Sequence, residues 1–99
     1  MRLSKYEHEK IKEIFIKIFN HGSLYLFGSR VDDSKKGGDI DLYVIPENYQ
    51  DKFSSKKMLF LLELKKLIGE QKIDLVIDRN ENRPIDTIAK QQGILLCKN

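Results

Sequence analysis

The sequence has one cysteine, no long apolar run and no grouping of histidines with cysteines. One cysteine, Cys97, cannot form a disulfide within the chain, which favours a reducing compartment. His8 and His21 have no neighbouring cysteine or histidine, so the sequence does not predict a zinc site. No segment has the length of a membrane span, and the first residues have no apolar signal core. We therefore expect a cytoplasmic protein outside the membrane.

Internal repeats, low-complexity segments and linkers are also missing, which predicts a single domain over residues 1–99. A chain of 99 residues has room for one core and one small sheet, but not for a separate domain that binds a second substrate. The net charge of +3 is mild. Direct nucleic-acid binding is not expected, because proteins with that function usually concentrate positive charge on one face.

Apolar periodicity and turn residues divide the chain into alternating helices and strands. Ser4 and Glu7 form a capping-box pattern at the start of the first helix. The predicted helices cover residues 5–19, 54 or 55 to 68, and 85–92, with a short one over 29–34. The predicted strands cover residues 24–27, 40–45, 73–77 and, as an edge strand, 94–97. This order predicts a compact α/β (α+β) fold, with a small mixed sheet of three to four strands flanked by helices.

Two carboxylates stand at the start of the second predicted strand. Side chains alternate between the two faces of a strand, so Asp39, Asp41 and Tyr43 share one face. Two carboxylates side by side repel each other unless a cation joins them. Mg²⁺ prefers oxygen ligands and commonly uses one or two carboxylates together with substrate phosphates. The Asp-x-Asp pattern therefore predicts half of a site for one or two hard cations.

A third carboxylate, Asp74, lies in the next predicted strand, whose other face is apolar. A charged residue inside such a strand is costly to bury without a partner. If the two strands are neighbours, Asp74 reaches the same metal pair as Asp39 and Asp41. Asp78 falls on the same face of the strand as Asp74 but at the strand end, so it is the second choice for the third metal-binding carboxylate.

A Gly-Ser turn precedes the carboxylates. Gly28 allows a close approach of the backbone to a ligand, and Ser29 offers an amide and a hydroxyl to a phosphate. Arg30, Lys35 and Lys36 add positive charge around this turn. Each pattern alone is weak, since most Gly-Ser pairs are plain turns, many Asp-x-Asp pairs are solvated strand ends, and the two lysines suit a solvated loop. Their combination predicts a site for phosphoryl or nucleotidyl transfer.

These residues resemble the signature of the nucleotidyltransferase superfamily of the DNA polymerase beta type, which is Gly-Ser, a spacer, Asp-x-Asp and a later aspartate. The Gly-Ser-Arg start and the small size are similar to the minimal nucleotidyltransferases of bacteria and archaea. The resemblance spans nearly the whole chain. The spacer over residues 30–38 departs from it, because it is richer in lysine and glycine than the Arg/Ala pattern of that subfamily.

The resemblance implies a set of site residues and partners. Asp39, Asp41 and Asp74 would be catalytic and would bind two Mg²⁺ ions, while Gly28, Ser29 and Arg30 would bind the nucleotide, with ATP as substrate. It also implies a HEPN-domain partner, a helical RNase toxin, for which the transferase acts as antitoxin by adding AMP to a tyrosine.

Three functions remain open at this point. The first is Mg²⁺-dependent transfer of a nucleoside monophosphate to a hydroxyl of a docked macromolecule. The second is an antitoxin that neutralises its partner by binding alone. The third is modification of a small molecule, which would need a second subunit to bind the acceptor.

The predicted helix over 54–68 carries more apolar residues than one face can hold. We favour packing in the core of a small protein, and the alternative is an interface with a partner or a second copy.

Overall fold

The computed structural model describes residues 1–34, 38–49, 53–69 and 71–99. Within them the chain forms helices and strands in the order α1 (Lys5–Phe19), β1 (Ser23–Phe27), the 3₁₀ turn η1 (Gly28–Val31), β2 (Ile40–Ile45), α2 (Phe53–Ile68), β3 (Ile73–Ile77), α3 (Pro84–Gln92) and β4 (Ile94–Lys98). This is the predicted order. The elements agree with the predicted ranges to within two residues at either end, apart from the short helix after Phe27.

The four strands form one sheet in the order β3-β2-β1-β4. β1 is antiparallel to both β2 and β4, whereas β3 runs parallel to β2. The sheet is therefore mixed, and β4 is an edge strand as predicted. Its central pair, β1 and β2, consists of the segments that flank the Gly-Ser turn and carry the Asp-x-Asp pattern.

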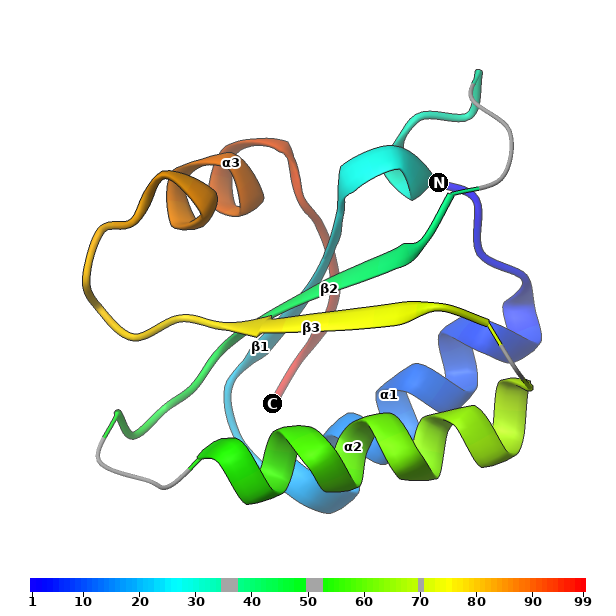
Figure 1. Cartoon of the computed structure of the whole chain (residues 1–99), viewed down its shortest axis with the longest axis horizontal. Coiled ribbons are helices and arrows are strands. Elements are labelled where there is room, and N and C mark those ends of the chain that lie inside the picture. The colour runs from blue at the N-terminus through cyan, green and yellow to red at the C-terminus, as the bar shows by residue number, and fades with distance from the viewer. Residues whose placement is uncertain (35–37, 50–52, 70) are drawn as a thin grey trace.

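Helices cover the two faces of the sheet unequally. α1 and α2 lie together against one face, and α3 lies against the other (Figure 1). Ile40, Leu42 and Val44 of β2 point into the main core beneath α1 and α2. Tyr43, on the opposite face, packs with Phe27 and with Ala89 of α3 in a smaller cluster.

Local sequence explains how α1 begins and ends. The Ser4 side chain accepts a hydrogen bond from the Glu7 amide, and the Glu7 side chain accepts one from the Ser4 amide, so the predicted capping box is confirmed. Asn20 is the C-cap, with a φ of 67°, and Gly22, two residues later, also has a positive φ, of 120°. Asparagine tolerates this conformation better than most residues.

The short helix predicted over 29–34 is wrong in length. The structure has a single 3₁₀ turn that ends at Val31, and Asp32 follows it in an extended conformation. Asp32 then accepts hydrogen bonds from both the amide and the hydroxyl of Ser34, at 2.9 and 2.6 Å. This local bonding competes with continuation of the helix.

The prediction that the apolar residues of α2 pack in the core holds for only part of the helix. Phe60 and Leu64 are fully buried, whereas the side chains of Met58, Leu59 and Leu62 are 73%, 46% and 54% exposed. No helix among the described residues is long and apolar enough to cross a membrane.

Candidate active site

The carboxylates of β2 and β3 meet on the face of the sheet that carries α3, which we term the carboxylate face. Asp41 and Asp74 are direct partners in the parallel register of the two strands. Asp39 lies just before β2, two residues from Asp41. Next along this face of β2 comes Tyr43, which is fully buried beside α3. The helix therefore covers the later half of the face and leaves the half with Asp41 and Asp74 open.

Asp41 lies in an electrostatically unfavourable position. Burial raises the pKa of its carboxyl, and the negative charges of Asp39 and Asp74 raise it further, while Lys72 lowers it. A half-buried carboxylate with two like neighbours is stabilised by a cation placed between them. The donor set, three carboxylates, is also the one that Mg²⁺ prefers.

In the present side-chain positions the three carboxylates do not converge. Among the described residues, no group of three acidic, histidine or cysteine side chains is close enough to hold one metal ion. The Asp39 carboxylate instead lies 3.5 Å from the ammonium of Lys72, which begins the approach to β3. Both side chains are well exposed, so this ion pair is weak and can exchange for another cation.

The Gly-Ser turn is packed directly against the carboxylates. Gly28 has a φ of 77°, and a Cβ at this position would collide with Oδ2 of Asp41. Gly38, with a φ of 88°, lies in the same way against Oγ of Ser29. Two glycines therefore let the turn, the Asp39 segment and the start of β2 approach more closely than residues with side chains would.

The guanidinium of Arg30 is directed at the protein backbone. It donates hydrogen bonds to the carbonyl oxygens of Arg2 and Gly38, at 2.9 and 3.2 Å, and to Oε1 of Gln71 at 3.4 Å. A contact between Arg30 and a nucleotide, as the sequence predicts, would have to replace some of these bonds. Lys35 and Lys36, the other predicted cations, lie outside the described residues.

Sequence reasoning missed Arg2, which fixes the same turn from the other side. Its guanidinium donates to the carbonyl oxygens of Ser29 and Asp32, at 2.8 and 2.9 Å, and its amide donates to the Arg30 carbonyl at 2.7 Å. No motif marks such a contact, because it joins the N-terminal segment to a turn 27 residues away. Lys72 was missed too, although its place just before Asp74 was visible.

Asp78, the second-ranked metal ligand, belongs to a different environment. It is 1% exposed and accepts hydrogen bonds from the Tyr49 hydroxyl at 2.6 Å and the Asn80 amide at 3.2 Å. Lys90 of α3 lies 3.4 Å from the same carboxylate. These bonds lower the pKa of Asp78 against the raising effect of burial, the largest single influence. Asp78 thus anchors α3 and is not directed at the open half of the carboxylate face.

Several solved structures share the fold of this chain. A chain in a toxin–antitoxin complex with AMP-PNP superposes with a TM-score of 0.75 at 21% identity, over 93% of this chain and 73% of that one. The complex of a tri-AMPylated Shewanella oneidensis HEPN toxin with MNT antitoxin gives 0.71 at 21%, over 94% and 71%. The toxin–antitoxin pair MntA–HepT gives 0.72 at 20%, over 97% and 74%. At these identities the likeness shows the fold.

No curated protein matches the sequence. A protein family does match it, the one described as "Polymerase beta, Nucleotidyltransferase", over residues 9–99. The matched region includes the Gly-Ser turn, the Asp-x-Asp pair and Asp74, and leaves out only the start of α1 and the residues before it. The chain therefore belongs to the polymerase beta nucleotidyltransferase family.

Proposed function

We propose that this chain is a Mg²⁺-dependent nucleotidyltransferase that moves AMP from ATP to a hydroxyl of a partner protein, a tyrosine of a HEPN toxin, and so acts as an antitoxin. The observation that carries the proposal is the register of Asp41 with Asp74 beside a glycine turn that touches Asp41. The Gly-Ser turn and the two carboxylates therefore lie together on one open part of the sheet.

Each predicted residue then has a role. Gly28 and Ser29 would hold the triphosphate, with Arg30 beside them. Asp39, Asp41 and Asp74 would hold Mg²⁺, which when bound neutralises phosphate charge and aligns the reacting oxygens. The acceptor hydroxyl attacks the α-phosphorus, its P–O bond forms as the bond to pyrophosphate breaks, and Asp74 helps to remove the hydroxyl proton.

The choice of acceptor is supported by the solved neighbours and by the size of the chain. One similar chain is an antitoxin bound to a tri-AMPylated HEPN toxin, and another lies in a complex that contains AMP-PNP. The residues that the structure describes form one sheet, and among them no second layer encloses an acceptor at the open site. A docked macromolecule supplies that layer.

The test is transfer of label from ATP labelled at the α-phosphate to a candidate HEPN-domain partner, with Mg²⁺ present. Wild type should label the partner, and Asp41→Asn should reduce labelling by at least about a hundredfold, as loss of a metal ligand does. The control is Glu47→Gln, which removes an exposed carboxylate beyond the other end of β2. Absence of label with wild type, or equal label with Asp41→Asn, would contradict the proposal.

One observation favours a second candidate, an antitoxin that acts by complex formation alone. Asp39 is paired with Lys72, and no three carboxylates among the described residues are gathered for a metal. Growth of cells that express the HEPN protein separates the two candidates. Rescue by Asp41→Asn equal to rescue by wild type would favour neutralisation by binding, whereas loss of rescue with retained binding would favour transfer.

A further inference from the structure

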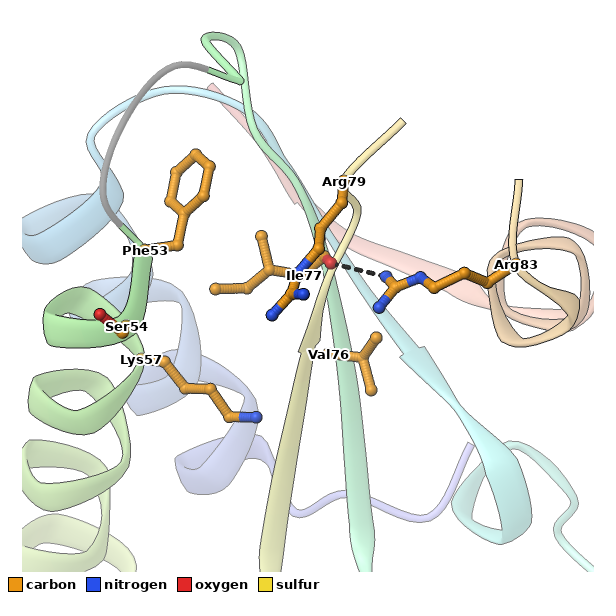
Figure 2. A pocket seen from close by; sticks show the side chains of 7 residues that line it. All are labelled: Phe53, Ser54, Lys57, Val76, Ile77, Arg79 and Arg83. Atoms are coloured by element: carbon orange, nitrogen blue, oxygen red, sulfur yellow. Dashed lines mark hydrogen bonds between the residues drawn. The ribbon is translucent and has the colours of Figure 1, made fainter. Parts of the chain in front are cut away.

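A pocket lies at the end of β3, away from the carboxylates. It has a volume of about 260 Å³ and lies between the first turns of α2 and the end of β3 (Figure 2). Its walls come from Phe53, Ser54, Lys57, Val76, Ile77, Arg79 and Arg83. We term it the cationic pocket, because its charged lining residues are all basic. A neighbouring hollow shares Phe53, Ser54 and Arg79 and also reaches Tyr49 and Glu81.

Two of the three cations that line this pocket have no polar partner among the described residues. Arg83 is engaged, because it donates to the Ile77 carbonyl at 2.8 Å and holds Asp86 at 3.0 Å. Lys57 and Arg79 form no hydrogen bond or ion pair with any residue in the described part of the chain. Figure 2 shows both side chains extending from opposite walls into the space between α2 and β3. Like charges held at one cavity repel each other, and an anionic group between them would relieve this repulsion.

The cationic pocket continues into an exposed apolar row on α2. Ser54 lines the pocket, and Met58 and Leu62 follow it at intervals of four residues, which places the three side chains along one line of the helix surface. Met58 is 73% exposed and Leu62 is 54% exposed. An α-helix in a monomeric domain normally turns its apolar side chains inward, and this row turns outward.

We propose that the cationic pocket and the row of Met58 and Leu62 form one docking site for a partner protein, which inserts a carboxylate between Lys57 and Arg79 and lays an adjoining apolar surface along α2. The proposal rests on the proposed function only in taking the HEPN protein as that partner. The site itself is defined by its charge and its exposed apolar side chains.

Two features favour a protein segment over a nucleic acid. Phe53, Val76 and Ile77 give the pocket apolar walls that suit the stem of an acidic side chain. The surface that continues from it is apolar, whereas a nucleic-acid path would continue as positive charge. The pocket and α2 lie on the side of the sheet opposite the carboxylates, and β3 is the edge strand between the two sides. β3 carries Asp74 near its start and the pocket at its end, about 10 Å apart along three residues of strand. A partner docked on α2 therefore reaches the carboxylates around the β3 edge, and the Gly-Ser turn stays accessible.

The experiment measures binding of the HEPN protein to the intact chain by titration calorimetry, at low and at physiological salt. Arg79→Glu and Leu62→Glu should each raise the dissociation constant by about tenfold or more, and the Arg79 effect should shrink as salt rises. Matched controls lie on β4, at the opposite edge of the sheet. They are Lys98→Glu for the charge and Leu95→Glu for the apolar side chain, since Leu95 is 49% exposed. Both controls should bind as wild type does.

Met58→Glu provides a third variant, at a position that is 73% exposed and therefore contributes little to the core. If Arg79→Glu, Leu62→Glu and Met58→Glu bind the HEPN protein as tightly as wild type does, the docking site is overturned. AMP transfer by the same proteins would leave the proposed function intact. If wild type binds the HEPN protein and the variants do not, but wild type transfers no AMP, the docking site stands and the proposed function is overturned. A wild-type chain that does not bind the HEPN protein overturns both.

Two other results would give this surface a different occupant and overturn the proposal. A dimer in light scattering that becomes a monomer in Leu62→Glu would assign the surface to a second copy of the chain. Weaker binding of labelled RNA by Arg79→Glu than by wild type would assign it to nucleic acid.

Discussion

Replacement of Asp86 tests how α3 is fixed over half of the carboxylate face. Asp86 is 2% exposed and is the N3 residue of α3. Its carboxylate accepts hydrogen bonds from the Arg83 amide at 2.8 Å, from the Arg83 guanidinium at 3.0 and 3.1 Å, and from the Tyr43 hydroxyl at 2.8 Å. The Asp86→Asn substitution keeps the shape of the side chain but removes the charge and half of the acceptor capacity.

The size of the effect follows from the pKa of this carboxyl. Hydrogen bonds from Arg83 lower the pKa from 3.8 to about 2 despite burial, and the Tyr43 hydroxyl helps. At 1.36 kcal/mol per pKa unit, the ionised carboxylate contributes at most about 2 kcal/mol to the free energy of unfolding. This is an upper value, because the Arg83 side chain is 30% exposed and partly screened by solvent. For a chain of this length the loss corresponds to a melting temperature lower by about 10 °C.

The sign of the pH dependence is fixed by the direction of the shift. A carboxyl whose pKa is lower in the folded chain stabilises the fold above its unfolded pKa, and this contribution is lost as the pH falls from about 4 to about 2. Asp78 also has a lowered pKa, and Tyr43 contacts both carboxylates, so the measured difference includes any change that the substitution causes at Asp78.

The assay is urea unfolding followed by circular dichroism at pH 7, 4 and 2.5. We expect wild type and Asp86→Asn to differ most at pH 7, and the difference to fall to roughly a third of that value by pH 2.5, because the folded carboxyl with a pKa of about 2 is then only partly protonated. The control is Glu9→Gln, an exposed carboxylate on α1, which should match wild type at every pH. A difference that stays constant down to pH 2.5, or no difference at pH 7, would refute the assignment of the stabilisation to this charge.

Three further predictions concern the site. Gly28→Ala should abolish ATP binding in a fluorescence titration because its Cβ meets Asp41. Gly69→Ala, also at a positive φ but with open space around it, should cost only about 1 kcal/mol of stability. Equal ATP affinities of the two variants would contradict this. Mg²⁺ at about a hundred times its dissociation constant should stabilise wild type by about 2–3 kcal/mol at pH 7, and an equal rise in melting temperature for Asp41→Asn would place the ion elsewhere. Arg2→Ala should raise KM for ATP several-fold while kcat changes little, because it loosens the turn without touching the carboxylates; a fall in kcat alone would count against this role.

Most of the fold could be predicted because its signals are local. Alternating side chains identified β2 and β3, and the capping box fixed the start of α1. The short helix after Phe27 was predicted too long because local bonds compete with it. Asp32 accepts hydrogen bonds from Ser34, and the 3₁₀ turn ends at Val31.

The candidate site was less predictable where it depends on contacts between distant segments. Asp41 and Asp74 come together by strand order and register, which the alternation of their strands allowed us to anticipate. The bonds of Arg30 to Gly38 and Gln71, and of Arg2 to the turn, join segments that only the folded chain brings together. From the sequence alone, a charged residue in a motif such as Arg30 is easily predicted to bind a ligand, although in the fold it binds backbone carbonyls.

Asp86 and Asp41 lie on the same side of the sheet, but their surroundings shift their pKa values in opposite directions. Hydrogen bonds from Arg83 and Tyr43 lower the pKa of Asp86. Burial, followed by the charges of Asp39 and Asp74, raises the pKa of Asp41, and Lys72, which is paired with Asp39, lowers it only in part. Three carboxylates beside one ammonium still carry net negative charge, so a further cation would stabilise the group. For this reason we propose the open half of the face as the place where a cation, and with it a nucleotide, binds.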